Sequence, residues 1–199
     1  MNTQAMTQAE KREYLITELL KERPEYADIF IPKDETEQKK LLRALFNVRL
    51  PLPIGDDFLR VQDEYLQEEI AQKGITSIDD SEPVKPDIYL WQGDITTLKC
   101  DAIVNAANSQ MLGCFCPNHG CIDNAIHTFS GVQLRLKCAE IMQKQGESEE
   151  TGKVKITPAY NLPCKYILHT VGPIVTGKLT DRDCELLRSC YRSCLTLAD

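Results

Sequence analysis

The sequence predicts an α/β fold preceded by an all-α segment. Three helix patterns occupy residues 7–74, and from Ile88 onward short β-type runs alternate with helical patterns. Charge divides the chain at the same place, because residues 1–87 carry 12 Lys/Arg against 19 Asp/Glu, whereas residues 88–199 carry 11 of each. We therefore expect a helical N-terminal extension with a linker over residues 1–87 and a second domain over residues 88–199. A chain of 199 residues buries a core without needing metal or disulfides.

The three N-terminal helices are predicted from their end signals and their apolar spacing. The first two begin at capping residues, and the third ends at a glycine. These signals are Thr7 with Glu10, Asp34 with Glu37, and Gly74. Residues 75–87 have the composition of a connector. The segment holds no catalytic constellation, so we interpret it as a helical cap on the second domain.

The second domain contains three strand patterns, a possible edge strand and two helix patterns. The strands are expected at 88–92, 101–104 and 166–171, with an edge strand at 154–156. A helix is expected over 124–144, and another after Thr180, which pairs with Asp183 in a capping-box pattern. Because ligands of such sheets bind beyond the carboxyl ends of the strands, the loops that follow the strands hold the candidate site.

Composition excludes several classes of function. No apolar run exceeds the four residues 88–91, which excludes a transmembrane helix, and Met1–Ala5 lack the features of a signal peptide. We therefore expect a cytoplasmic protein without membrane contact. No basic stripe supports nucleic-acid binding, although backbone N–H groups can still hold a single nucleotide. Nine cysteines, an odd number, are expected as free thiols or metal ligands.

The densest chemistry lies between Cys114 and His127. Five soft-metal ligands fall within fourteen residues: Cys114, Cys116, His119, Cys121 and His127. Thiolate with imidazole favours Zn²⁺. Cys114, His119 and Cys121 form the preferred set, which leaves a fourth position open as in catalytic zinc sites. If Cys116 also bound, the site would be closed and structural, and free cysteines with a surface histidine remain the alternative without metal.

Other titratable side chains have structural interpretations. Asp123 directly precedes the helix predicted at 124–144 and could be its N-cap, which is compatible with a functional role. His127 is expected to pack or hydrogen-bond inside that helix, and His169 to be a core histidine. Cys190 and Cys194 fit a helix face as small core residues. The remaining cysteines have no partner at ligand spacing: Cys100, Cys138, Cys164 and Cys184.

Polar side chains follow two of the predicted strands. Asp94 could accept a hydrogen bond from an exocyclic amine such as that of adenine, or simply cap a turn. Asn105 and Asn108 present amides separated by two alanines, which suits sugar hydroxyls approached closely.

Several linked motifs resemble those of MacroD-type macrodomains. They are Gly93-Asp94-Ile95-Thr96, residues 101–109 (DAIVNAANS), residues 122–127 (IDNAIH), residues 155–163 and residues 169–173. The resemblance covers residues 88–199 and implies a mixed sheet between helices. Where that family carries a glycine-rich loop, this chain has the Cys114–Cys121 segment. This segment and the helical N-terminal part are similar to the zinc-dependent macrodomains of bacteria and some microbial eukaryotes.

The resemblance implies an activity, partners and roles for individual residues. These macrodomains remove mono-ADP-ribose from acidic side chains, and in some bacteria they are encoded beside a sirtuin that modifies a lipoyl-carrier protein. By the same resemblance, the adenine binds Asp94 and Ile95, and the distal ribose binds Asn108. Zinc binds Cys114, His119 and Cys121. The phosphates border the backbone of Ile122, Asp123 and Asn124. Zinc is the expected main electrophile, and Asp123 is the catalytic helper that orients or deprotonates water. A module that only binds ADP-ribose and an interaction protein with a closed zinc knuckle are the alternatives.

The resemblance also gives an expectation about completeness. The chain stops at Asp199 inside a helix pattern, before the further strands and the second glycine-rich phosphate loop of a complete macrodomain. We therefore expect it to be the N-terminal portion of a longer macrodomain.

Overall fold

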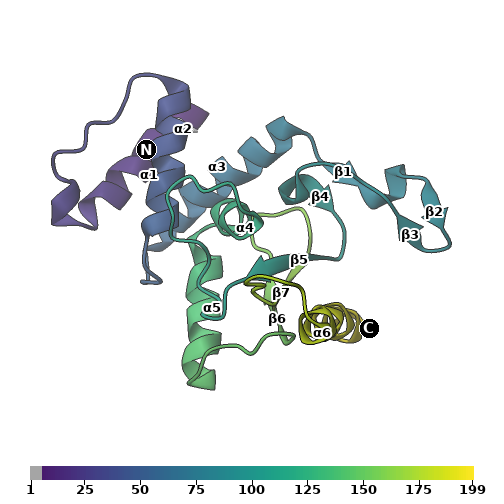
Figure 1. Ribbon diagram of the computed structural model, residues 1–199. Coiled ribbons are helices and arrows are strands. Elements are labelled where there is room, and N and C mark those ends of the chain that lie inside the picture. Colours follow the sequence, from purple (N-terminus) through teal and green to yellow (C-terminus); the bar gives the residue numbers. More distant parts are fainter. Residues whose placement is uncertain (1–5) are drawn as a thin grey trace.

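A computed structural model describes residues 6–199. Residues 1–5, which carry the argument against a signal peptide, lie outside the described residues. The N-terminal helices form one group, and a small sheet with three further helices forms another beside it (Figure 1).

The N-terminal segment folds as three helices: α1 (Gln8–Lys21), α2 (Glu35–Val48) and α3 (Asp56–Lys73), with a short 3-10 turn η1 (Pro24–Tyr26) after the first. The predicted end signals are confirmed. Thr7 and Glu10 form a reciprocal capping box, Asp34 accepts from the Glu37 N–H, and Gly74 ends α3 at φ 89°. Helix α1 packs on both α2 and α3 through a shared apolar core, which includes Leu15, Ile16, Leu42, Phe46, Phe58, Val61 and Leu66.

The second group is a mixed sheet between helices, as the sequence predicts. Its three strands are β5 (Ala102–Ala107), β6 (Val154–Pro158) and β7 (Tyr166–Val171), in the order β5-β7-β6. Strand β7 runs parallel to β5 and antiparallel to β6, which is an edge strand. Helices α4 (Ile122–Ser130) and α5 (Val132–Gln145) lie on one side, and α6 (Asp181–Ala198), opened by the predicted Thr180 capping box, lies on the other (Figure 1).

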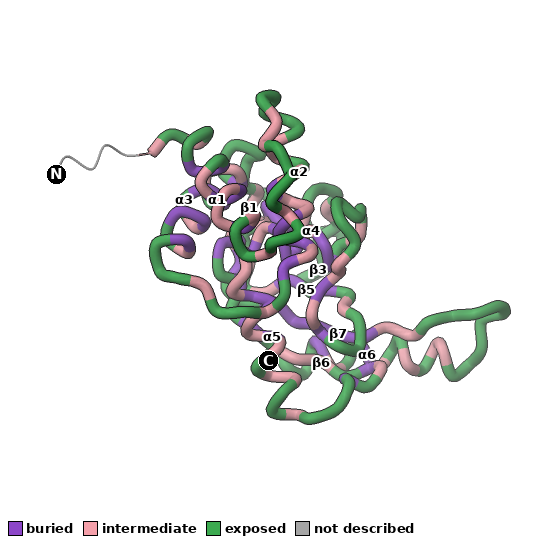
Figure 2. Tube along the Cα trace, turned by 90° about the vertical axis from the view of Figure 1, so that its left-hand side faces the viewer, coloured by how far each residue is buried: buried purple, intermediate pink, exposed green. Residues whose placement is uncertain are grey.

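The core of the sheet meets the core of the helical segment. Buried residues of β5, β7, α4 and α5 form the sheet core, and Ile70 of α3 is part of it. Phe129 of α4 packs against both cores. The buried backbone accordingly runs through the middle of the molecule, where α2, α4 and β5 approach one another (Figure 2). Helix α4 therefore lies between the helical segment and the sheet.

Residues 75–99 differ from the prediction. Only Ile88–Tyr89 (β3) of the strand expected at 88–92 is extended, and it pairs with β2 (Pro83–Lys85) in an exposed hairpin. Asp87 occupies the left-handed region at φ 60° in the turn, a conformation that Asp tolerates. The rest of the connector forms β1 (Thr76–Ser77), paired with β4 (Leu98–Lys99), and the turns η2 (Ile78–Asp80) and η3 (Ile95–Thr97). The apolar run at 88–92 is thus outside the main sheet, with Leu90 81% exposed.

The helix expected over 124–144 is two helices. Gly131, at φ 94° and ψ 173°, separates α4 from α5, and this region is accessible essentially to glycine alone. The Gln62 side chain of α3 accepts a hydrogen bond from the Val132 N–H at 2.9 Å and so takes the place of a local cap. The break depends on a residue 70 positions away, which the periodicity of residues 124–144 does not reveal.

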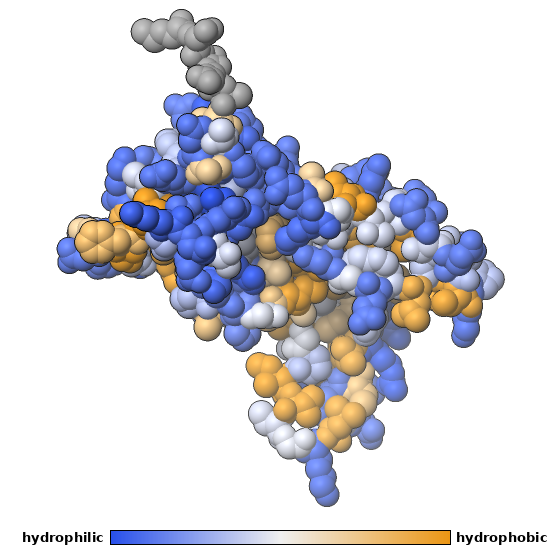
Figure 3. Space-filling view, turned by 90° about the horizontal axis from the view of Figure 1, so that it is seen from above, coloured by the Kyte–Doolittle hydropathy of each residue, from blue (hydrophilic) through white to orange (hydrophobic). Residues whose placement is uncertain are grey.

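Helix α6 carries exposed apolar side chains, two of which line a cavity beside β5. Figure 3 shows apolar side chains gathered on the protruding helix in the lower part of the view. Three exposed side chains of α6 are Leu187, Tyr191 and Leu195, which are 49%, 68% and 68% exposed. None of the helices in residues 6–199 combines the length and the apolar character that a membrane crossing requires.

We predict that Gly131→Ala destabilises the protein by about 1–3 kcal/mol. Its Cβ would require a strained backbone and would lie 2.6 Å from the Gln62 amide nitrogen. Gly55→Ala is the matched control, because Gly55 has nothing within 4 Å of the added Cβ. Urea unfolding measures both variants. Equal stability of Gly131→Ala and wild type would contradict the backbone argument.

Candidate functional site

Three predicted metal ligands lie together on the loop that joins β5 to α4. The side-chain donor atoms of Cys114, His119 and Cys121 are all within 4.8 Å of one another. The Cys114 Sγ lies 3.7 Å from the His119 Nδ1. Cys116 is exposed and is not part of this group of described residues. The arrangement is a three-ligand set at the surface, with His119 exposed and both cysteines half-buried.

Cys121 also begins α4. Its Sγ accepts a hydrogen bond from the Asn124 N–H at 3.4 Å, so Cys121 is the N-cap of the helix. This corrects the prediction that Asp123 could be the N-cap, because Asp123 is already the second helical residue. Burial raises the pKa of the Cys121 thiol. Coordination requires the thiolate form, and a bound cation would oppose the effect of burial by lowering the pKa of the thiol.

The carboxylate of Asp123 points into the protein and is held by Asn105. The Asn105 Nδ2 donates to the Asp123 Oδ1 at 2.8 Å, and the Asp123 side chain is 8% exposed. Burial raises the pKa of Asp123, partly offset by that hydrogen bond. Asn105 is completely buried in β5, so its amide does not face a sugar as the sequence analysis proposed. Its partner Asp123 is 18 positions away, and no local pattern indicates the contact.

Two histidines lie behind Asp123. His169 is the core histidine predicted: its Nδ1 lies 3.1 Å from the Asn105 Nδ2 and its Nε2 lies 2.9 Å from the Thr157 Oγ1. His127 packs inside α4, with its Nε2 3.6 Å from the Asp123 Oδ1 and neither ring nitrogen hydrogen-bonded to a described residue. Burial lowers the pKa of both histidines, that of His169 to about 4.

The cysteines outside the loop are free thiols, and most fit their predicted structural interpretation. All nine cysteines of the chain are unpaired, and Cys190 and Cys194 are buried where α6 meets the sheet. Cys138 differs, because its Sγ lies within 4.8 Å of a ring nitrogen of both His127 and His169. Sequence spacing gave it no partner, since the three residues come from α4, α5 and β7.

At the other end of the candidate site, Asp94 caps a turn. Its Oδ1 accepts from the Thr96 N–H at 3.0 Å, and its Oδ2 lies 3.0 Å from the Lys73 Nζ at the end of α3. Burial raises its pKa, but the hydrogen bonds from Thr96 and Lys73 outweigh burial and leave the pKa below its ordinary value. Ile95, which follows, packs against the sheet core. A negatively charged Asp94 can accept hydrogen bonds from an amine.

The remaining predicted ligand-binding residues surround the carboxyl end of β5. Asn108 is exposed. Its Nδ2 donates to the Gly113 carbonyl at 2.9 Å, and its Oδ1 accepts from the Gln110 N–H at 3.1 Å. Ile122 is 36% exposed and lines a cavity of about 300 Å³ with Ala106 and Gly172. The buried Asn124 directs its side chain under the metal-ligand loop, where its Nδ2 donates to the Cys116 carbonyl at 3.0 Å.

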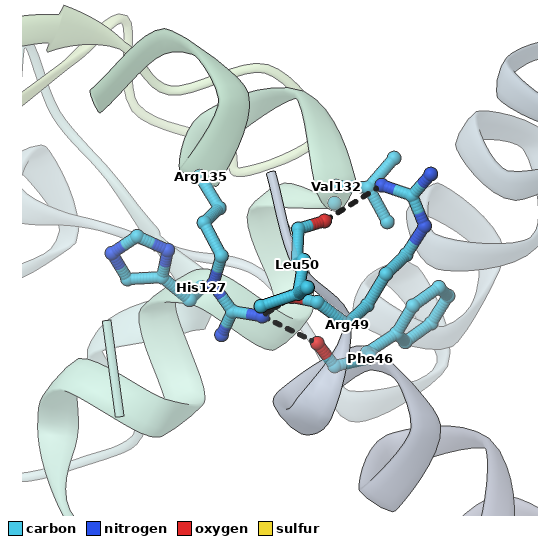
Figure 4. Close-up of a pocket in the computed structure, with 7 residues that line it drawn as sticks. Phe46, Arg49, Leu50, His127, Val132 and Arg135 are labelled. Atoms are coloured by element: carbon cyan, nitrogen blue, oxygen red, sulfur yellow. Dashed lines mark hydrogen bonds between the residues drawn. The ribbon is translucent and has the colours of Figure 1, made fainter. Parts of the chain in front are cut away.

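A buried arginine that the sequence analysis missed lies beside this loop. The Arg135 Nε donates to the Leu112 carbonyl at 2.7 Å, and its Nη1 donates to the carbonyls of Phe46 and Arg49. Figure 4 shows the guanidinium between His127 and the end of α2. Its planar group also stacks 4.3 Å from the centre of the Phe115 ring. No signal in the sequence pairs Arg135 with carbonyls more than 80 positions away.

Comparisons with known proteins show the family of the chain. Residues 104–199 match the family described as Macro domain. The chain is 63% identical over 197 residues to a protein-ADP-ribose hydrolase of Treponema medium, covering 97% of this chain and 76% of that protein. The chain belongs to the macrodomain family.

Further similarities place this macrodomain among enzymes and solved structures of the same family. It is 51% identical over 189 residues to a protein-ADP-ribose hydrolase of Staphylococcus aureus strain MSSA476, covering 94% of this chain and 71% of that protein. It also resembles the macrodomain of Trypanosoma brucei solved in complex with ADP-ribose. That match has a TM-score of 0.54 and 29% identity and covers 84% of this chain and 69% of the other.

We predict that His169 makes the macrodomain less stable in acid. Native His169 has a pKa of about 4 against 6.5 for an ordinary histidine, so between these values the unfolded chain binds a proton that the native chain does not. The free energy of unfolding should therefore fall by up to about 3 kcal/mol as the pH drops through this interval. The groups that face His169 are His127, Cys138, the Asn105 amide and the Thr157 hydroxyl.

Urea unfolding of wild type and His169→Gln at pH 7, 5.5 and 4 measures this contribution, since other groups contribute equally to both proteins. The difference in stability between the two should shrink as the pH falls. An NMR titration of the His169 ring provides a check that needs no variant. A midpoint near 6.5 would show that the interpretation is wrong.

Proposed function

We propose that this macrodomain is a zinc-dependent hydrolase that removes mono-ADP-ribose from acidic side chains of modified proteins. The observation that carries the proposal is the cluster of Cys114, His119 and Cys121, whose last member begins α4 two positions before Asp123 in the sequence. The names of the relatives from T. medium and S. aureus support hydrolysis, and the T. brucei complex supports ADP-ribose as the ligand. The proposal thus rests on the three clustered side chains of this chain and on the names of its relatives.

The three donors fit a zinc ion. Sulfur and nitrogen ligands at about 2.3 and 2.0 Å from a tetrahedral ion lie roughly 3.5 Å apart, and the Cys114 Sγ and His119 Nδ1 are separated by 3.7 Å. Two thiolates with one imidazole are soft ligands that favour zinc. Bound there, Zn²⁺ would supply Lewis acidity toward an oxygen of the ribosyl ester or of the attacking water.

The surrounding residues would hold the substrate and move the proton. The backbone of Ile122, Asp123 and Asn124 at the N-terminus of α4 would border the phosphates, with the N–H groups of Ile122 and Asp123 as donors, because the Asn124 N–H already donates to the Cys121 Sγ. Asp94 and Ile95 would take the adenine, and Asn108 the distal ribose. Asp123, held by the Asn105 amide, would accept a proton from water as the ester between ribose and carboxyl group is hydrolysed. The products are free ADP-ribose and a carboxyl group on the protein.

The cellular setting is part of the proposal. Nine free thiols suit the reducing cytoplasm, so we propose that the enzyme acts there. Its substrate would be an ADP-ribosylated protein, and a lipoyl-carrier protein modified by a sirtuin is the substrate that the family resemblance implies.

We predict that release of ADP-ribose from a glutamate-modified protein by the full-length enzyme requires zinc. A chelator should abolish release and added zinc should restore it. Cys121→Ser should lower zinc affinity at least about tenfold, because it removes a ligand. Serine still caps a helix, so α4 should persist. Tight ADP-ribose binding without release would instead indicate a binding module.

Cys116→Ser is the matched control in the same loop. Cys116 lies outside the three-ligand group, so this variant should bind zinc and release ADP-ribose as wild type does. Loss of zinc from Cys116→Ser would contradict the open site and indicate a closed structural zinc knuckle.

We also predict that Asp123→Asn lowers kcat about 10²–10⁴-fold, the usual contribution of a general base. Asparagine is isosteric and still accepts the hydrogen bond from Asn105, so folding and ADP-ribose binding should be unchanged. Single-turnover release, with binding followed by calorimetry, measures both. Near-normal kcat would remove Asp123 from the mechanism.

A further inference from the structure

The metal-ligand loop has little regular structure, yet side chains of the surrounding helices hold its backbone at four points. The contacts are made at the Leu112 carbonyl, the Cys116 carbonyl, the Asn118 N–H and the His119 carbonyl. The partners come from α5, α4 and, twice, α2. Helix α2 belongs to the N-terminal segment, in which the sequence analysis found no functional group.

Arg43 of α2 makes the first of these remote contacts. Its Nη2 donates to the His119 carbonyl at 3.0 Å and to the Asn124 Oδ1 at 2.8 Å, and its Nε donates to the same Oδ1 at 3.2 Å. Asn124 in turn donates to the Cys116 carbonyl. The guanidinium therefore holds His119 directly, and it holds the backbone at Cys116 through Asn124. No salt bridge within residues 6–199 competes for Arg43.

Asn47, one helical turn further along α2, makes the second contact. Its Oδ1 accepts from the Asn118 N–H at 2.9 Å, and its Nδ2 donates to the Thr128 Oγ1 at 3.0 Å. Thr128 donates onward to the Asn124 carbonyl at 2.7 Å. Because Asn47 is 1% exposed, these bonds are shielded from water and set the position of Asn118, the neighbour of His119.

Such fixing matters for a three-ligand metal site. Ordering a flexible loop costs conformational entropy, and a site whose ligands are already ordered does not incur this cost on binding. Partners that orient the ligands of a metal typically contribute 10–100-fold to its affinity. Arg43 suits this role better than Lys would, because its rigid planar fork aims Nε and Nη2 in fixed directions, whereas an ammonium on a flexible stem fixes its acceptors less firmly.

We propose that Arg43 and Asn47 are positioning residues through which α2 pre-orders the loop that carries Cys114, His119 and Cys121. The inference rests on the proposed function for the identity of the metal, whereas the pre-ordering of the loop does not depend on it. The N-terminal helical segment is then part of the active enzyme.

Amide hydrogen exchange of the metal-free full-length protein tests the pre-ordering directly. Arg43→Ala should increase exchange in residues 112–121 while α1 and β7 keep their protection. Lys40→Ala is the matched control, because Lys40 lies on α2 and, among residues 6–199, forms an ion pair with Glu37 alone, at 2.8 Å. Unchanged protection of residues 112–121 in Arg43→Ala, or loss of protection throughout the protein, would overturn the proposal.

Zinc affinity, measured by competition with a chromogenic chelator, gives the functional readout. Arg43→Ala should bind zinc about 10–100-fold more weakly than wild type, Arg43→Lys should fall between them, and Lys40→Ala should match wild type. Wild-type affinity in Arg43→Ala would overturn the role in metal binding. If the wild-type protein bound no zinc but Arg43→Ala still loosened the loop, the proposed metal would fail and the pre-ordering by α2 would stand.

Discussion

The buried guanidinium of Arg135 is the interaction on which the arrangement of the site depends. It joins the end of α2, through the carbonyls of Phe46 and Arg49, to the Leu112 carbonyl at the start of the metal-ligand loop. Burial lowers its pKa to about 10, so it stays charged at neutral pH. A buried cation is costly unless its donors are satisfied, and here backbone carbonyls at the C-terminus of a helix serve this purpose. The helical segment and the sheet are therefore fixed to each other at the site itself.

This junction explains why the helical segment reaches both ends of the candidate site. At one end Arg43 holds the loop with the cysteine and histidine ligands, and at the other Lys73 pairs with Asp94. Between them, Phe129 packs in both apolar cores and keeps α4 in place. The catalytic candidate Asp123 projects from that helix toward Asn105 in β5. The site is thus assembled from the helical segment, the loop, α4 and the sheet, and none of these forms it alone.

The parts that the sequence predicts well are those whose physics is local. The capping boxes at Thr7 and Thr180 need only four consecutive residues, and Cys114, His119 and Cys121 come together because they lie within one short loop, while their binding of zinc stays a prediction. The errors lie where distant residues decide. Gly131 breaks a helix whose periodicity continues through it, because Gln62 receives the exposed N–H. Asn105 turns inward to Asp123, and Arg43 acts across 76 positions, so neither role is visible in a single sequence without the fold.

The measurement that tests the central claim most directly is zinc K-edge X-ray absorption of the full-length protein loaded with one equivalent of Zn²⁺. An open site built by Cys114, His119 and Cys121 predicts two sulfur ligands at about 2.3 Å, one imidazole nitrogen at about 2.0 Å and one further light atom. Three sulfur ligands would contradict it, because Cys116 would then close the site and leave no position for water or substrate.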